Sequence, residues 1–122
     1  MYKRQSLRAF DTALRAVDLH PNLVPEAVKL TAVKMLIEHT GREDPGAEAQ
    51  SAAAEIVAYC LLGAEAFADA NGAGPADEVE QRINAALAAG TSLDARLVLL
   101  TLHARVIQPS VVDHFKLEVA SD

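Results

Sequence analysis

Apolar residues recur every three or four positions through most of the chain, which is the spacing that places side chains on one face of an α-helix. Leu7, Phe10, Leu14 and Val17 give the first such stripe. The same pattern predicts about six amphipathic helices, over residues 6–19, 25–40, 45–71, 75–89, 92–107 and 109–119. Because the predicted connections are only a few residues long, neighbouring helices should be mostly antiparallel. We therefore predict an all-α fold, a compact helical bundle.

Proline and glycine mark most of the predicted boundaries. Pro25, Pro45 and Pro75 each stand in the first turn of a predicted helix, where a missing N–H costs no hydrogen bond. Gly41 and Gly90 follow two of the helices, at positions where a left-handed backbone is often required. The Gly-Ala-Gly-Pro segment that ends at Pro75 predicts a flexible turn.

Two of the predicted helices should lie at the centre of the bundle. The helix over 45–71 is apolar nearly all round between Ile56 and Ala64, which a surface helix would not tolerate. Gly63 lies inside this helix, at a cost of about 1 kcal/mol relative to alanine, and indicates a close helix crossing or a kink. The helix over 92–107 is the second strongly apolar segment.

The first five residues, Met-Tyr-Lys-Arg-Gln, resemble the translation of a transposon-derived sequencing adapter read from a GTG start. Residues 1–5 are therefore expected to be a non-native or disordered segment, with a single helical domain over 6–120. On this interpretation the natural protein extends upstream of Ser6.

Composition and charge narrow the classes of function. About a fifth of the chain is alanine, 51% is hydrophobic and only 4% is aromatic, so the core should consist of small aliphatic side chains. The net charge of −6 and the pI near 5.1 argue against a nucleic-acid partner, because phosphate binding needs a basic face. No apolar run is long enough for a membrane span. We expect a cytoplasmic protein with no membrane or nucleic-acid partner.

Cys60 is the only cysteine, which excludes an intramolecular disulfide and fits a reducing compartment. Its neighbours Val57, Ala58, Leu61 and Leu62 are apolar, and no basic residue close in sequence would lower the pKa of its thiol. We expect a buried Cys60 that packs as a small hydrophobic side chain, with a reactive thiol as the alternative.

Motifs for cofactor, metal or nucleophilic chemistry are missing. The chain has no phosphate-binding loop, no dinucleotide glycine fingerprint and no Gly-x-Ser-x-Gly sequence. It also has no Glu-x-x-His pair and no His-Glu-x-x-His sequence, so we expect no metal and no cofactor. No catalytic residue is assigned, and an enzyme is the less favoured interpretation.

Three residues are candidates for ligand contact. His103 lies in the strongly apolar helix over 92–107, seven residues after Arg96 and so on the same helix face. It is either a hydrogen-bonded core or boundary histidine or a partly buried acid/base group. Tyr59 is the third candidate. His114, beside Asp113, is interpreted as part of a solvated face.

Acidic residues gather on both sides of the predicted Gly-Ala-Gly-Pro turn. They either solvate the surface and match helix dipoles, or form a docking patch for a basic partner. The residues of this predicted acidic patch are Glu65, Asp69, Asp77, Glu78 and Glu80.

The favoured hypothesis is a non-enzymatic helical domain for protein–protein interaction or scaffolding, which binds a protein partner or a second copy of itself. It depends on spare apolar surface at Leu23, Val24, Leu62 and Leu117. One alternative is the ligand-sensing regulatory domain of a longer protein truncated at its N-terminus. The other is a small enzyme that uses His103 with Arg96 and a carboxylate from another helix.

Overall fold

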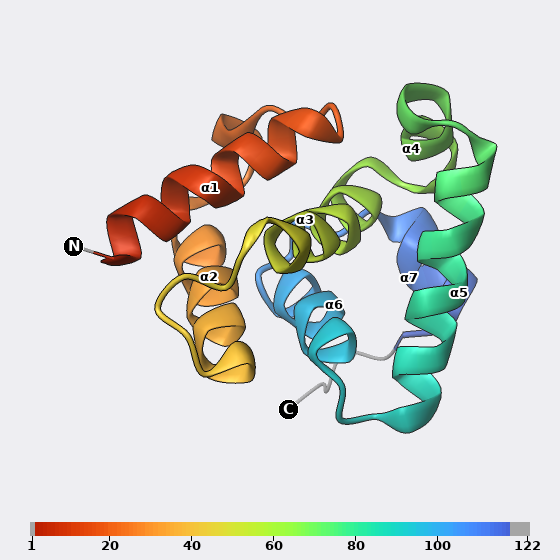
Figure 1. The fold of residues 1–122 in the computed structure, drawn as a ribbon. Helices are drawn as coiled ribbons and strands as arrows, with labels where there is room; N and C mark the ends of the chain where they lie inside the picture. Colours follow the sequence, from red (N-terminus) through yellow and green to blue (C-terminus); the bar gives the residue numbers. More distant parts are fainter. Residues whose placement is uncertain (1, 118–122) are drawn as a thin grey trace.

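The structure is a computed structural model that describes residues 2–117, and over that range the chain is helical with no strand. Figure 1 shows the elements packed into one bundle, as the sequence predicted. In chain order the elements are α1 (Tyr2–Ala16), the short 3₁₀ helix η1 (Pro21–Leu23), α2 (Glu26–Thr40), α3 (Ala47–Leu62), α4 (Ala64–Asn71), α5 (Ala73–Ala89), α6 (Leu93–His103) and α7 (Pro109–Phe115).

Helix α3 lies at the centre, with α1 and α2 on one side and α5 on the other (Figure 1). Every residue from Ile56 to Leu61 is buried, which confirms that the segment that is apolar nearly all round runs through the core. Cys60 is fully buried as predicted, and this burial raises the pKa of its thiol to about 12, although the nearby Thr101 side chain acts to lower it.

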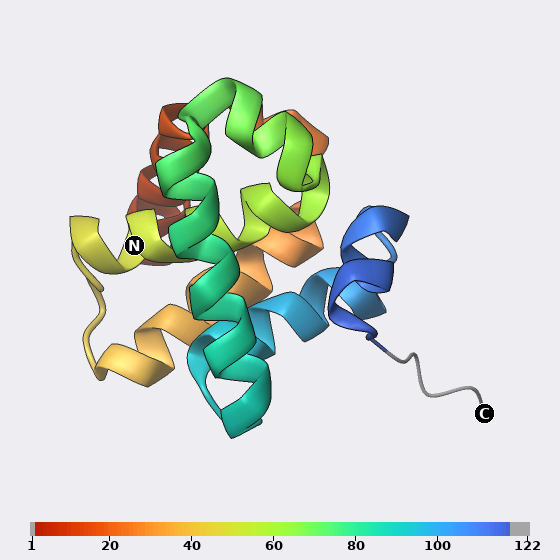
Figure 2. The same cartoon turned by 90° about the vertical axis from the view of Figure 1, so that its right-hand side faces the viewer.

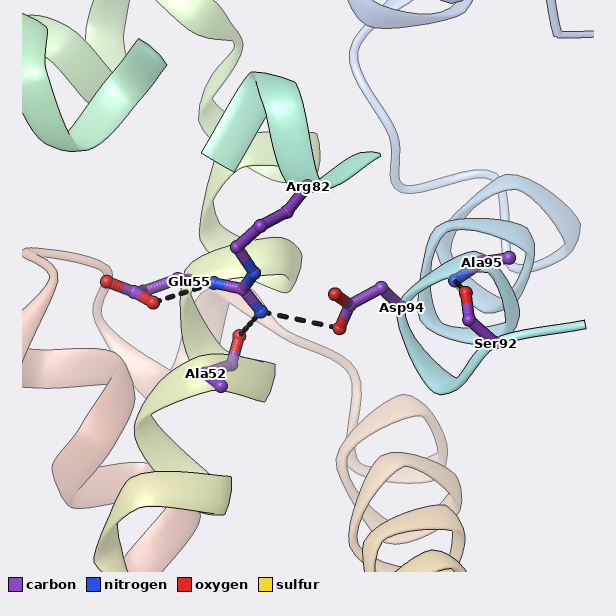
Figure 3. A network of polar contacts seen from close by, with 6 residues as sticks. All are labelled: Ala52, Glu55, Arg82, Ser92, Asp94 and Ala95. Atoms are coloured by element: carbon purple, nitrogen blue, oxygen red, sulfur yellow. Dashed lines mark hydrogen bonds and ion pairs between the residues drawn. The ribbon is translucent and has the colours of Figure 1, made fainter. Parts of the chain in front are cut away.

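Helix α6 is the second central element, since it packs against α2, α3 and α5. Leu97, Val98 and Leu102 bury its inner face. The helix begins with a side-chain cap in which Ser92 Oγ accepts a hydrogen bond of 3.2 Å from the backbone N–H of Ala95 (Figure 3).

The predicted helix over 45–71 is two helices, because the backbone breaks at Gly63. This residue has φ +90° and ψ 161°, a conformation essentially restricted to glycine. The break leaves two carbonyl oxygens at the end of α3 without a donor from the helix, and Gln108 donates a hydrogen bond to each of them. Its backbone N–H donates to Cys60 O and its side-chain Nε2 donates to Leu61 O, each over 2.8 Å. Helix α3 therefore ends at this point instead of bending, and the break is stabilised by Gln108, which lies 47 positions after Leu61.

Helices α4 and α5 form a tight hairpin around Gly72, whose φ is +103°. The predicted turn ending at Pro75 is wrong: α5 already begins at Ala73, so Pro75 lies in its first turn. Asn71 joins this hairpin to the opposite side of the bundle, because its Nδ2 donates to Val17 O over 3.1 Å.

The N-terminal helix begins at Tyr2 and ends at Ala16, so residues 2–5, which we expected outside the domain, are helical. Its predicted apolar stripe is confirmed, with Phe10, Leu14 and Val17 buried. The predicted end of the last helix at 119 and of the domain at 120 lie outside the described residues.

Arg82 ties α5 to both central helices (Figure 3). Its Nη1 lies 2.9 Å from Glu55 Oε1 on α3, and its Nη2 lies 3.3 Å from Asp94 Oδ1 on α6. Nη2 also donates to Ala52 O over 3.1 Å. The guanidinium thereby fixes the position of α5, which carries several of the acidic residues considered below.

Within residues 2–117, no single helix is both long and apolar enough to cross a membrane. Within the same range, α5 and α6 taken together reach the length and apolar composition of a membrane span, but the two helices are bent by 94° with respect to each other.

Candidate functional site

A surface hollow of about 260 Å³ opens where the end of α3, the start of α4 and α7 meet. Figure 2 faces this end of the molecule, with the α4–α5 hairpin in front and α7 to its right. We call this cavity the acidic hollow; it is lined by Tyr59, Ala64, Glu65, Ser110, Val111 and His114.

A second depression continues the surface along α4. It shares Ala64, Glu65 and Ser110 with the acidic hollow and adds Asp69. Two carboxylates of the predicted acidic patch, Glu65 and Asp69, therefore lie along one continuous recess.

The break at Gly63 creates this recess. Because α4 leaves the axis of α3 there, the first turn of α4 and the N-terminal turn of α7 become its walls. A Cβ atom at Gly63 would lie 3.3 Å from Ser110 Oγ, so glycine also permits the close approach of α7. Gln108, immediately before α7, holds the two segments together through Cys60 and Leu61.

Glu80 of α5 contacts two of the lining residues, Tyr59 and His114, through one of its oxygens. The hydroxyl of Tyr59 donates to Glu80 Oε1 over 3.2 Å, and Nε2 of His114 lies 3.3 Å from the same atom. Tyr59 is 1% exposed, whereas the side chains of Glu80 and His114 are 37% and 52% exposed. The three residues come from three helices and link α3, α5 and α7.

The Tyr59 hydroxyl keeps its proton at neutral pH and can donate it to Glu80. Burial raises the pKa of Tyr59 from its ordinary 10.0 to about 12, and the charge and hydrogen bond of Glu80 add to the rise. Tilted ring contacts with Phe67 and Phe115, at centroid distances of 5.7 and 6.2 Å, hold the tyrosine ring in place. The rings of His114 and Phe115 meet nearly at right angles, with their centroids 4.8 Å apart.

The surroundings of the hollow are strongly negative. Glu65, Asp69, Asp77 and Glu78 are exposed and form no ion pair among the residues that the structure describes. The charge of Asp77 contributes to the raised pKa of Tyr59, so it acts on the same site. Of the predicted acidic patch, Asp77 and Glu78 line neither recess.

The structure does not bring Arg96 and His103 to this site. Arg96 lies on the exposed side of α6, where its Nη2 is 3.9 Å from Glu38 Oε1. His103 is the last residue of α6 and is exposed. The expectation of a core or partly buried His103 is wrong, because the helix face that carries Arg96 and His103 points to solvent, with Leu99 between them 39% exposed.

A serine and a histidine share the hollow, since Ser110 and His114 lie one turn apart on α7. Within residues 2–117 no hydrogen bond joins the Ser110 hydroxyl to His114, so the contact that activates a serine nucleophile is not formed. The same range contains no group of three or more metal-ligating side chains placed to hold an ion.

A second candidate surface lies on α2, where Leu30 is 45% exposed, Ile37 is half-buried and Val33 is buried. Leu30, Val33 and Ile37 line a groove of about 250 Å³ together with Thr31 and Lys34. The expected apolar surplus is only partly correct. Leu23 is 65% exposed, but Val24 is 2% exposed and belongs to the core, and Leu62 and Leu117 are half-buried.

Sequence reasoning named Tyr59 and Glu80 separately and missed that they meet. It also missed His114 and Ser110 as site residues, although their spacing on one helix face was a visible signal. No family model, no curated protein and no solved structure matches the chain.

Proposed function

We propose that this chain is a non-enzymatic helical protein-interaction domain that binds a positively charged segment of a partner protein in the acidic hollow. The observation that carries the proposal is a recess between α3, α4 and α7 along which Glu65 and Asp69 are exposed and form no ion pair among the described residues.

The charge of the recess favours an arginine- or lysine-bearing partner. Glu65 and Glu80 flank the hollow, and Asp69 extends the negative surface along α4. Complementary charge across an interface accelerates association and selects the partner more than it adds affinity. A basic segment of a partner would supply the cations that this surface lacks.

The walls suit the shape of a long basic side chain. Ala64 and Val111 provide apolar contact for a methylene stem, while the carboxylates meet the charged end. The walls are also fixed in advance, because the Tyr59–Glu80 and Gln108–Leu61 hydrogen bonds connect the helices that form them. Preorganisation of this kind lowers the entropic cost of binding.

Binding of a labelled arginine-rich peptide, measured by fluorescence anisotropy, tests the proposal. The double variant Glu65→Gln/Glu80→Gln should weaken binding about fivefold to tenfold, because two partly exposed ion pairs are lost. A matched control, Glu43→Gln/Glu48→Gln, removes the same charge from exposed positions before α3 and in its first turn. The control should change the affinity by less than about twofold.

Two results would overturn the proposal. One is an equal loss of affinity in both double variants, since binding would then follow net charge alone. The other is no measurable binding of the basic peptide to the wild-type chain.

A further inference from the structure

His114 is the positively chargeable group of the acidic hollow, and it contacts the carboxylate that the partner's cation would use. Its Nε2 lies 3.3 Å from Glu80 Oε1, the same oxygen that accepts the hydrogen bond of Tyr59. Half of the His114 side chain is exposed, so a proton can reach it from solvent.

The two protonation states of His114 differ in their effect on the hollow. A neutral ring adds no charge beside Glu80 and leaves the negative charge of the carboxylate uncompensated. A protonated ring places a full positive charge next to Glu80 and forms an ion pair inside the site. Histidine is the side chain that ordinarily makes this change between pH 5 and 8.

We propose that protonated His114 competes with the partner's cation for Glu80, so that the acidic hollow binds its basic segment at neutral pH and releases it as the pH falls. This inference rests on the proposed function, and it makes binding of the partner pH-dependent.

The groups around His114 make it the source of this dependence. Glu80 faces it from α5, Glu65 shares its hollow from α4, Tyr59 approaches from α3 and Asp113 precedes it on α7. All of them except Tyr59 are carboxylates. Tyr59 keeps its proton well above neutral pH, because burial raises its pKa to about 12.

The direction of the effect follows from linkage. A bound arginine withdraws Glu80 from His114 and adds a like charge nearby, so it opposes protonation of the ring. Protonation must then weaken arginine binding by the same factor. Arginine itself stays charged across this pH range, so the peptide contributes no titration of its own.

The test measures the dissociation constant of an arginine-rich peptide from about pH 8 to about pH 5.5 at constant salt. The wild-type chain should bind about threefold more weakly at the acidic end, the size expected of one partly exposed ion pair. His114→Gln retains a hydrogen-bond donor but cannot be charged, and its affinity should change much less. His103→Gln, at an exposed histidine on α6, should keep the wild-type dependence.

An equal pH dependence in wild-type protein and His114→Gln would overturn the inference while leaving the proposed function intact. Absence of binding at every pH would instead overturn the proposed function. A second measurement needs no variant: the NMR titration midpoint of His114 should fall when the peptide is added. An unchanged or raised midpoint contradicts the competition.

Discussion

The side-chain amide of Gln108 donates a hydrogen bond of 2.8 Å to the carbonyl oxygen of Leu61, at the point where α3 ends. The backbone N–H of Gln108 makes a bond of the same length to Cys60 O. Together they satisfy carbonyls that a continuous helix would have used internally. The break at Gly63 is therefore a stable feature, and the hollow beside it is a consequence of that break.

Replacement of Gly63 by alanine distinguishes the break from the continuous helix that the sequence predicts. In a helix interior, Gly63→Ala should stabilise the fold by about 1 kcal/mol. At φ +90° and ψ 161° the same change should destabilise it by about 1–3 kcal/mol, because this conformation is strained for any residue with a Cβ. Urea unfolding measures the sign. Gly74→Ala, which has open space around its Cβ and lies in α5, is the matched control.

Burial of the charged Lys29 side chain costs free energy, and an ion pair with Asp11 of α1 offsets this cost. Its Nζ lies 3.2 Å from Asp11 Oδ1 and 3.6 Å from Glu26 Oε1, and its side chain is 7% exposed. Asp11→Asn should lower the free energy of unfolding by about 1–2 kcal/mol, because the ammonium keeps only its second partner. In a Lys29→Met background the same change should cost almost nothing. Equal costs in the two backgrounds would show that the ion pair contributes nothing.

The fold could be predicted from the sequence to the extent that its signals are local. The spacing of Phe10, Leu14 and Val17 identifies a buried face, and glycines such as Gly41 and Gly90 mark helix ends with left-handed backbones. The break at Gly63 carries no comparable local signal, because a glycine within an apolar run is equally consistent with a kink. Its conformation depends on Gln108, which is distant in the sequence.

The candidate site, like the fold, could be predicted only where its features depend on residues close together in the sequence. Tyr59 and the acidic patch could be named from the sequence, but their contact spans 21 residues and depends on how α5 is placed. Arg82 sets that placement through contacts with both central helices. The spacing of apolar residues along the sequence does not reveal such contacts. His103 was singled out because its helix is apolar, yet the face that carries it is the exposed one.

The Tyr59 hydroxyl should ionise far later than an ordinary tyrosine. In a Tyr2→Phe variant Tyr59 is the only tyrosine, and its absorbance titration should have a midpoint near pH 12 in the folded protein and near 10 in urea. The unfolded chain loses this proton first, so the free energy of unfolding should fall as the pH rises from 10 to 12. A midpoint near 10 for folded protein, verified by circular dichroism, would contradict the buried contact with Glu80.

The most direct test of the central claim is an NMR titration of the isotope-labelled chain with a short, end-blocked peptide that contains one arginine. The account predicts saturable shifts at the backbone amides of Glu65, Ser110 and His114. The same peptide with neutral citrulline in place of arginine should leave these amides unchanged, because it retains the shape and loses the charge. Equal shifts with both peptides, or shifts confined to other helices such as α2, would contradict a cation-binding acidic hollow.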